Sequence, residues 1–190
     1  MKDKLINKED FSVSEWSGGT TTQLIIEPEG ADFKNRDFDF RISSATFTST
    51  ASTFSDFSGY QRYILPLKGQ LSVDHKDLYQ RSLQPYEVEY FSGSWHTDST
   101  NSLDCVDYNF IVKDGKFANL QVFAQEASYI PKRSGSLCFF SLEDFTIEIN
   151  DGKNSKNIPG NSMYVIREED SIYKIDIKNN QMPVILCEFK

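Results

Sequence analysis

Short stretches of alternating apolar and polar residues follow one another along this chain, and turn dipeptides separate them. Within residues 38–47, Phe40 and Ile42 fall on one side of an extended backbone, and Arg41 and Ser43 fall on the other. An alternation of period two is the pattern of a β-strand, and no window has the 3.6-residue period of an amphipathic helix. The sequence therefore predicts an all-β protein, built as a sandwich, jelly roll or barrel.

The expected strands are short and recur along the whole chain. They cover residues 20–27, 38–47, 60–67, 71–75, 86–91, 105–112, 120–123, 137–140, 145–149, 163–166, 172–177 and 184–189. The turns between them are marked by dipeptides that end in glycine, namely Ser58-Gly59, Lys68-Gly69, Ser92-Gly93, Asp114-Gly115, Asp151-Gly152 and Pro159-Gly160. Glycine at these places suits the tight connections of an antiparallel fold. Residues 168–170 are predicted to form a solvated turn.

A break near Lys113 to Gly115 divides the chain into two strand-rich parts, residues 1–112 and residues 113–190. Similarity between the parts is too weak to establish an internal repeat. No flexible linker separates them, so we expect the two halves to pack as one compact unit.

Charge and cysteine usage exclude several classes of protein. The net charge is −8 and no basic cluster is present, which disfavours binding to nucleic acid or to anionic membranes. The three cysteines are far apart, form no CxxC pair and are expected to be buried, reduced thiols, Cys105, Cys138 and Cys187. Without a signal-peptide pattern or a long apolar run, the chain is predicted to be cytoplasmic.

The histidines argue against a metal site. Metal-binding cupin barrels typically have a glycine, five further residues, and then a His-x-His pair with a nearby glutamate. Here Gly69 is followed at that spacing by His75, but Asp77 stands at the next ligand position and no suitable glutamate follows. We therefore predict no metal, and we expect His75 to be a half-exposed strand end. The segment 92–95 also lacks the second glycine of a serine-nucleophile elbow.

Two other strands have a polar face whose direction alternation alone does not decide. Arg41 and Ser43 share one such face, and Asp107 and Asn109 share another. These faces would be solvated if the large apolar faces formed the core, and would line a pocket if they turned inward. By the same pattern, residues 86–91 are expected to expose Glu87 and Glu89 and to bury the tyrosines opposite them.

A series of short motifs in fixed order resembles the HutD/Ves family. The resemblance covers roughly residues 16 to 112, and the motifs are Trp16-Ser-Gly18-Gly19-x-Thr21, Phe40-Arg41-Ile-Ser43-Ser-Ala45, Phe54-Ser55-x-Phe57-Ser-Gly59-Tyr-Gln-Arg62, Phe91-Ser-Gly93 and Asp107-Tyr108-Asn109. The family usually has tryptophan where Phe40 stands and aspartate where Ser94 stands.

This resemblance implies a bicupin, which is a chain of two cupin-like antiparallel β-barrels of the RmlC-like jelly-roll type. It also implies that no metal or other cofactor is bound. The family name links these proteins to histidine utilisation, in which the intermediates are small carboxylates. No settled enzymatic activity accompanies the family, so the resemblance points to binding of a small carboxylate metabolite in a sensing or regulatory role.

The resemblance also implies site residues, because the family motifs fall on the polar strand faces. Arg41 or Arg62 would hold the ligand carboxylate through a bidentate, charge-assisted pair. The polar groups that would orient the rest of the ligand or flank it are Ser43, His96, Asp107 and Asn109, and the wall of the site would come from Trp16 and Tyr60. In the alternative interpretation, Arg41 and Asp107 form only a structural ion pair inside the barrel.

Two other functions stay open at this point. The protein could be a metal-independent isomerase or hydrolase, with His96 or Asp107 as general base. It could instead be an interaction or assembly protein, for example a homodimer formed through its tyrosine- and phenylalanine-rich strands.

Overall fold

The structure is a computed structural model that describes residues 2–167 and 174–190. Within these residues, the chain forms antiparallel β-strands and one short 3-10 helix, Lys8–Asp10. The prediction of an all-β protein is confirmed. The turn expected at residues 168–170 and the beginning of the strand expected at 172–177 lie outside the described residues. No helix in the described part of the chain is long and apolar enough to cross a membrane.

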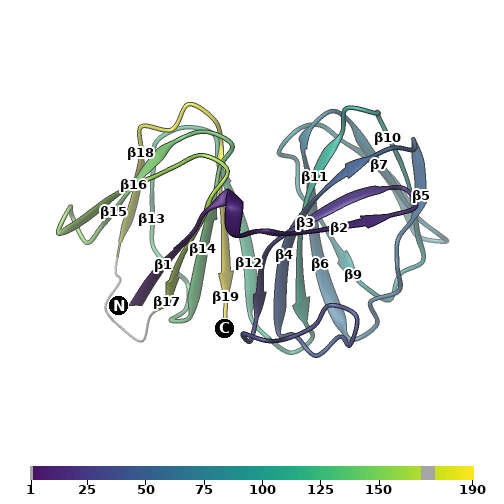
Figure 1. The fold of residues 1–190 in the computed structure, drawn as a ribbon, viewed down its shortest axis with the longest axis horizontal. Helices are drawn as coiled ribbons and strands as arrows, with labels where there is room; N and C mark the ends of the chain where they lie inside the picture. The colour runs from purple at the N-terminus through teal and green to yellow at the C-terminus, as the bar shows by residue number, and fades with distance from the viewer. Residues whose placement is uncertain (1, 168–173) are drawn as a thin grey trace. The chain divides into compact units, whose positions relative to one another are not determined.

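The strands divide into two compact units. One comprises Ser12–Gly115, and the other comprises Met1–Phe11 together with Lys116–Lys190. The two units differ from the expected halves at the start of the chain. Residues 1–11 belong to the second unit, because β1 (Lys2–Ile6) pairs antiparallel with β17 (Met163–Arg167). Figure 1 shows β1 beside β17. Alternation identifies a strand but not its partner, so sequence order alone assigned residues 1–11 to the first half.

The Ser12–Gly115 unit contains a six-stranded sheet and a four-stranded sheet. In spatial order, the larger sheet consists of β2 (Ser12–Trp16), β3 (Gly19–Glu27), β4 (Phe40–Phe47), β11 (Val106–Lys113), β6 (Tyr60–Lys68) and β9 (Glu89–Ser92). The smaller consists of β5 (Ala51–Thr53), β10 (Thr97–Asn101), β7 (Leu71–His75) and β8 (Tyr79–Leu83).

Close packing of the backbone explains one glycine of this unit. At Gly19, where β3 begins, a Cβ atom would lie 1.9 Å from the carbonyl oxygen of Thr46 on the paired strand β4. Only glycine permits that approach, so Gly19 lets β3 dock against β4.

The second unit likewise has two antiparallel sheets. A five-stranded sheet consists of β1, β17, β14 (Ser136–Phe140), β19 (Val184–Phe189) and β12 (Ala118–Phe123). A four-stranded sheet consists of β13 (Ala127–Tyr129), β18 (Ile175–Lys178), β15 (Phe145–Ile149) and β16 (Asn154–Ile158). Isoleucines and phenylalanines of both sheets meet in one buried cluster, which includes Phe139, Ile147 and Ile177. The three cysteines are buried, as predicted.

Candidate functional site

Strand register gathers the polar residues singled out by the sequence on one face of the larger sheet. On β11, Asn109 lies opposite Ser43 of β4, and Ile111 lies opposite both Arg41 of β4 and Arg62 of β6. The polar faces of these strands are buried, because each of the polar residues named here is only 3–9% exposed. This decides the alternative that alternation left open, because the polar faces turn away from solvent.

Arg41 is held by two polar side chains and by an aromatic ring. Its Nε donates to Gln23 Oε1 at 2.8 Å, and its Nη1 donates to Ser43 Oγ at 3.1 Å. The guanidinium carbon lies 4.0 Å from the centre of the Phe33 ring, which is a cation–π distance. Sequence reasoning missed Gln23; the signal lies in the pairing of β3 with β4, which sets Gln23 opposite Ser43.

Among the described residues, Arg62 has fewer hydrogen-bond partners than Arg41. Its Nη2 donates to Asn109 Oδ1 at 3.1 Å, but the buried Nε has no hydrogen-bond partner within the protein. Its guanidinium carbon lies 4.7 Å from the Phe54 ring centre and 5.1 Å from that of Phe91. Aromatic rings stabilise the charge but do not replace hydrogen-bond acceptors, so Arg62 keeps an unused donor in a buried place.

Asp107 is the acidic member of this cluster. Its Oδ1 accepts a hydrogen bond from the backbone N–H of Ala45 at 2.9 Å. Burial raises the pKa of the Asp107 carboxyl to about 7, and the Ala45 hydrogen bond and the charges of Arg62 and Arg41 only partly offset this effect. Among the described residues, no carboxylate oxygen lies within ion-pair distance of either guanidinium, so the alternative of a direct Arg41–Asp107 ion pair is not observed.

Both arginines remain charged despite their burial. Desolvation lowers the pKa of Arg41 and of Arg62 to about 10 in each case, and Asp107 opposes that change. Both guanidiniums are therefore cations at neutral pH. Chemically, the cluster offers two buried cations, a free N–H donor and neutral polar neighbours, which is the composition of an anion-binding site. We call Gln23, Arg41, Ser43, Arg62, Asp107 and Asn109 the arginine cluster.

Three other expected site residues are not joined to this cluster by a hydrogen bond, an ion pair or a ring contact. Tyr60 is buried, and its hydroxyl lies 2.7 Å from the carbonyl oxygen of Arg36, so it ties backbone together. Trp16 is 39% exposed and packs edge-on against Phe47 at 6.2 Å between ring centres. His96 is exposed, with its Nε2 3.9 Å from Asp98 Oδ1 beside the smaller sheet.

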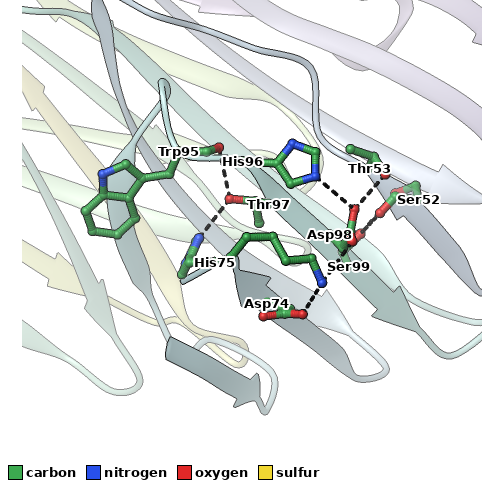
Figure 2. A network of polar contacts seen from close by, with 10 residues as sticks. Ser52, Thr53, Asp74, His75, Trp95, His96, Thr97, Asp98 and Ser99 are labelled. Carbon is green, nitrogen blue, oxygen red and sulfur yellow. Dashed lines mark hydrogen bonds and ion pairs between the residues drawn. The ribbon is translucent and has the colours of Figure 1, made fainter. Parts of the chain in front are cut away.

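The expectation that His75 lies at a half-exposed strand end was wrong. It is 1% exposed, and its ring packs against Phe91, Trp95 and Tyr79 with ring centres 4.7 to 5.2 Å apart. Its Nδ1 lies 2.8 Å from Thr97 Oγ1 (Figure 2). The last residue of β7 therefore points into the unit, on the same side as the buried Val73, instead of out toward the turn.

The expected exposure of Glu89 was also wrong. Pairing with β6 sets Glu89 opposite the buried Ile64 and sets Tyr90 opposite Tyr63, which inverts the predicted faces. Glu89 is buried and accepts hydrogen bonds from Tyr79 Oη and Arg81 Nη1, each at 2.7 Å. Tyr90 is 54% exposed. The buried carboxylate is thus paired with Arg81, and in the described part of the chain it forms no ion pair with Arg41 or Arg62.

A hollow of this unit lies away from the arginine cluster. It has a volume of about 800 Å³ and lies on the face of the four-stranded sheet that carries Asp74, Lys76 and Asp98. Lys76 makes ion pairs with both aspartates. Its lining holds two acidic residues, Asp74 and Asp98, and two basic residues, Lys76 and Arg81, so these charges balance and supply no net positive charge for an anion. A hollow of about 350 Å³ in the other unit is lined by Asp3, Lys156 and further residues.

Metal ligands are not assembled in the described part of the chain. Within residues 2–167 and 174–190, no group of three or more histidine, cysteine, aspartate or glutamate side chains is arranged to hold a metal ion.

Comparison with known proteins places this geometry in context. The family model described as HutD matches residues 8–182. Among solved structures, a conserved protein of unknown function from Pseudomonas aeruginosa PAO1 is 21% identical, with all of both chains covered and a TM-score of 0.86. HutD from Pseudomonas fluorescens SBW25 is 20% identical, with 100% of this chain and 98% of that chain covered and a TM-score of 0.79.

More distant structures show the same fold. An oxalate decarboxylase from Lactobacillus farciminis is 9% identical, covers 97% of this chain and 85% of its own, and has a TM-score of 0.62. A cupin 2 conserved barrel domain protein from Leptotrichia buccalis is 13% identical over 98% and 96% of the two chains, with a TM-score of 0.56. The predicted cupin-like architecture is confirmed. No curated protein matches the sequence significantly.

Proposed function

Because the chain belongs to the HutD family, we propose that its Ser12–Gly115 unit binds a small carboxylate through Arg41 and Arg62. The protein would act as a metal-independent sensor or regulator linked to histidine utilisation, as the family name suggests. One observation carries the proposal, namely that two buried guanidiniums face a single carboxyl group, Asp107, whose pKa is raised to about 7.

The charge balance of the arginine cluster supports an anionic ligand. At neutral pH, Arg41 and Arg62 contribute two positive charges, and burial, which raises the pKa of Asp107 to about 7, keeps its carboxyl partly protonated. A buried charge without a counter-ion destabilises the protein, because the free energy lost on desolvation is offset only by an opposite charge and by hydrogen bonds. A ligand carboxylate would supply both the missing charge and the missing acceptors.

The hydrogen-bond pattern supports a carboxylate in particular. Arg62 Nε has no partner, while its Nη2 is occupied by Asn109. A planar carboxylate accepts two parallel N–H bonds from one guanidinium, so it matches the donors of an arginine better than a spherical anion does. Gln23 and Ser43 hold Arg41 in place, and this leaves its remaining N–H donors for the ligand.

Two relatives are described together with formate, the smallest carboxylate. The HutD structure from Pseudomonas fluorescens was obtained in a formate condition, and the oxalate decarboxylase from Lactobacillus farciminis is a formate complex. These descriptions concern those proteins, and they make formate a reasonable first probe for this one.

A second candidate function is a metal-independent isomerase or hydrolase that acts on the same carboxylate. It is favoured by Asp107, because a carboxyl group with a pKa near 7 is suited to general acid–base work at neutral pH. His96, the other base considered, is exposed beside the smaller sheet and forms no contact with the cluster. Recovery of the bound carboxylate chemically unchanged after long incubation would argue against this candidate.

The binding proposal is tested by thermal unfolding with a panel of formate, acetate, succinate, malate and glutamate, each with and without a chelator. A ligand that binds only the native protein raises the melting temperature by mass action, by an amount that grows with concentration. We expect at least one carboxylate to raise the melting temperature equally in the presence of chelator. Chloride at equal ionic strength is the control, and an equal shift with chloride, or no shift with any carboxylate, would contradict the proposal.

A further inference from the structure

A second incompletely paired nitrogen lies in the same unit. His75 is almost fully buried, and its Nε2 has no hydrogen-bond partner within the protein. Histidines in a protein core normally have both ring nitrogens satisfied, because a buried polar atom without a partner is costly. The unused Nε2 therefore needs an explanation beyond packing.

The hydroxyl of Thr97 bears on which nitrogen of His75 carries the proton. Thr97 Oγ1 lies 3.2 Å from the carbonyl oxygen of Trp95, which can only accept, and 2.8 Å from His75 Nδ1. We assign its one hydrogen to the Trp95 carbonyl, which makes the hydroxyl an acceptor toward Nδ1. Figure 2 shows both interactions. Nδ1 must then hold a hydrogen, and in the neutral imidazole Nε2 is left as a bare acceptor.

The charged groups around His75 are compatible with this neutral form. Burial lowers the pKa of His75 and Arg62 lowers it further, whereas Glu89 and Asp74 oppose the change. A neutral imidazole with hydrogen on Nδ1 is thus the expected state at neutral pH. Nε2 in that state can pair only with a group that donates a hydrogen bond.

His75 and Arg62 lie against the same ring from two different sheets. Phe91 sits opposite Arg62 in the pairing of β6 with β9, and the Arg62 guanidinium carbon is 5.1 Å from its ring centre. The imidazole of His75, which comes from β7, is 4.7 Å from Phe91 between ring centres. The two unpaired nitrogens, Arg62 Nε and His75 Nε2, therefore belong to side chains that both pack against the Phe91 ring.

We propose that His75 is a specificity-determining residue, whose Nε2 accepts a hydrogen bond from an N–H or O–H group of the carboxylate held by Arg62. This inference rests on the proposed function and narrows its ligand class to small carboxylates that carry such a donor, such as hydroxy acids or amides of amino acids. Carboxylates in which hydrogen or methylene replaces the donor would leave Nε2 unpaired in the complex.

The first test needs no ligand. Two-bond 1H–15N correlation spectra of the ¹⁵N-labelled protein report which imidazole nitrogen is protonated, and His96 is an internal control because it is exposed and is the other histidine of the chain. We expect His75 to show hydrogen on Nδ1 and a bare Nε2. A resonance pattern with hydrogen on Nε2 would overturn the inference and would leave the proposed function intact.

The second test compares ligands that differ in one donor. Malate against succinate and glycolate against acetate are such pairs, measured by calorimetry with the wild-type protein and the His75→Phe variant. The donor-bearing member should bind roughly tenfold more tightly to the wild type, and the preference should vanish in His75→Phe. Its binding should also move the Nε2 resonance of His75.

The outcomes separate the two proposals. Equal binding within each pair, with His75 Nε2 unmoved, would overturn the role of His75 alone. Failure of every carboxylate to bind would overturn the proposed function and this inference with it. If His75→Phe does not fold, His75→Gln takes its place. Glutamine retains a side-chain acceptor, so this variant is expected to keep part of the preference for the donor-bearing ligand. Loss of all discrimination in a folded His75→Gln, together with an unmoved Nε2 resonance in the wild type, would count against the inference.

Discussion

Arg41 and Arg62 lie on opposite sides of strand β11, and each is directly opposite the same residue of that strand, Ile111. Their backbones are thus two strand spacings apart, which is roughly 9 to 10 Å. Arginine side chains are long enough to converge across that distance above the middle strand. Two cations that share one buried face repel each other unless an anion lies between them, and this is the position in which the proposed carboxylate would be held.

The first prediction concerns the conflict between binding and stability at Arg62. Replacing a whole buried ion pair by apolar residues of similar volume is often neutral or stabilising, by about 1 to 4 kcal/mol. In the part of the chain that the structure describes, Arg62 has no carboxylate within ion-pair distance whose charge its removal would leave uncompensated. We therefore expect Arg62→Met to unfold at the same or a higher urea concentration than the wild type. The same variant should lose the rise in melting temperature that a carboxylate produces in the wild type.

The control for this prediction is Arg133→Met, which removes an exposed arginine of the other unit. It should leave the carboxylate response unchanged. Tryptophan fluorescence is a suitable probe, because both tryptophans of the chain, Trp16 and Trp95, lie in the Ser12–Gly115 unit. An Arg62→Met protein that is folded and still responds to carboxylate would exclude Arg62 from the site.

Asp107 should make the stability of the protein depend on pH. Its pKa rises from 3.8 in the unfolded chain to about 7 in the folded protein, so the folded state binds more protons between these values. The stabilisation from the neutral acid is complete below pH 4 and is lost as the pH rises through 7. The rise in pKa corresponds to roughly 4 kcal/mol.

The measurement compares the free energy of unfolding of the wild type and of Asp107→Asn between pH 4 and pH 8. Asparagine keeps an acceptor for the Ala45 N–H and cannot ionise. We expect Asp107→Asn to gain stability relative to the wild type as the pH rises. In the control Asp104→Asn the trend should be reversed and small, because that exposed carboxylate has a lowered pKa. A difference that does not change with pH would show that Asp107 titrates normally.

A third prediction separates Glu89 from the arginine cluster. Glu89 is buried and is paired with Arg81, whose side chain is 43% exposed. Arg81→Met should destabilise the Ser12–Gly115 unit by roughly 2 to 3 kcal/mol, because it leaves a buried carboxylate without its cation. The double variant Arg81→Met/Glu89→Gln should recover most of that loss.

This double-mutant cycle is measured by urea unfolding, followed by tryptophan fluorescence. Glu89→Gln alone should cost less than Arg81→Met, since the glutamine can still accept from Tyr79. Additive effects of the two substitutions would mean that the 2.7 Å contact between Arg81 and Glu89 is not coupled in solution.

The sequence allowed the strands with large alternating side chains to be predicted, but strands made of small polar residues were missed. The strand β10 consists of Thr-Asp-Ser-Thr-Asn and β8 of Tyr-Gln-Arg-Ser-Leu, and neither pattern resembles a half-buried strand. Both form because they pair with β7, which carries Leu71 and Val73 into the core. Pairing across the chain, rather than local preference, decides such strands.

The candidate site was predictable in part. The motifs identified Arg41, Arg62, Asp107 and Asn109, and the structure brings all four to one buried face. What the sequence did not contain was the direction of each face, since a shift of one residue exchanges inside and outside. That ambiguity explains why Glu89 was expected in solvent.

The last prediction tests the backbone that supports β11. Gly69 and Gly115 both have a left-handed φ, of +73° and +81°, so alanine at either position is strained to a similar degree. They differ in space, because a Cβ atom at Gly69 would lie 2.8 Å from Cys105 Cα, whereas one at Gly115 meets nothing within 4 Å. Gly69→Ala should therefore push on the residue directly before β11.

We expect Gly115→Ala to cost about 1 kcal/mol from the left-handed backbone alone. Gly69→Ala should cost about 1 to 3 kcal/mol more, because the added clash is with backbone atoms that cannot rotate away. Urea unfolding of both variants measures the difference directly. If Gly69→Ala also weakens carboxylate binding while Gly115→Ala does not, the position of β11 limits the geometry of Asp107 and Asn109. Equal losses for the two variants would show that the chain near Cys105 yields easily.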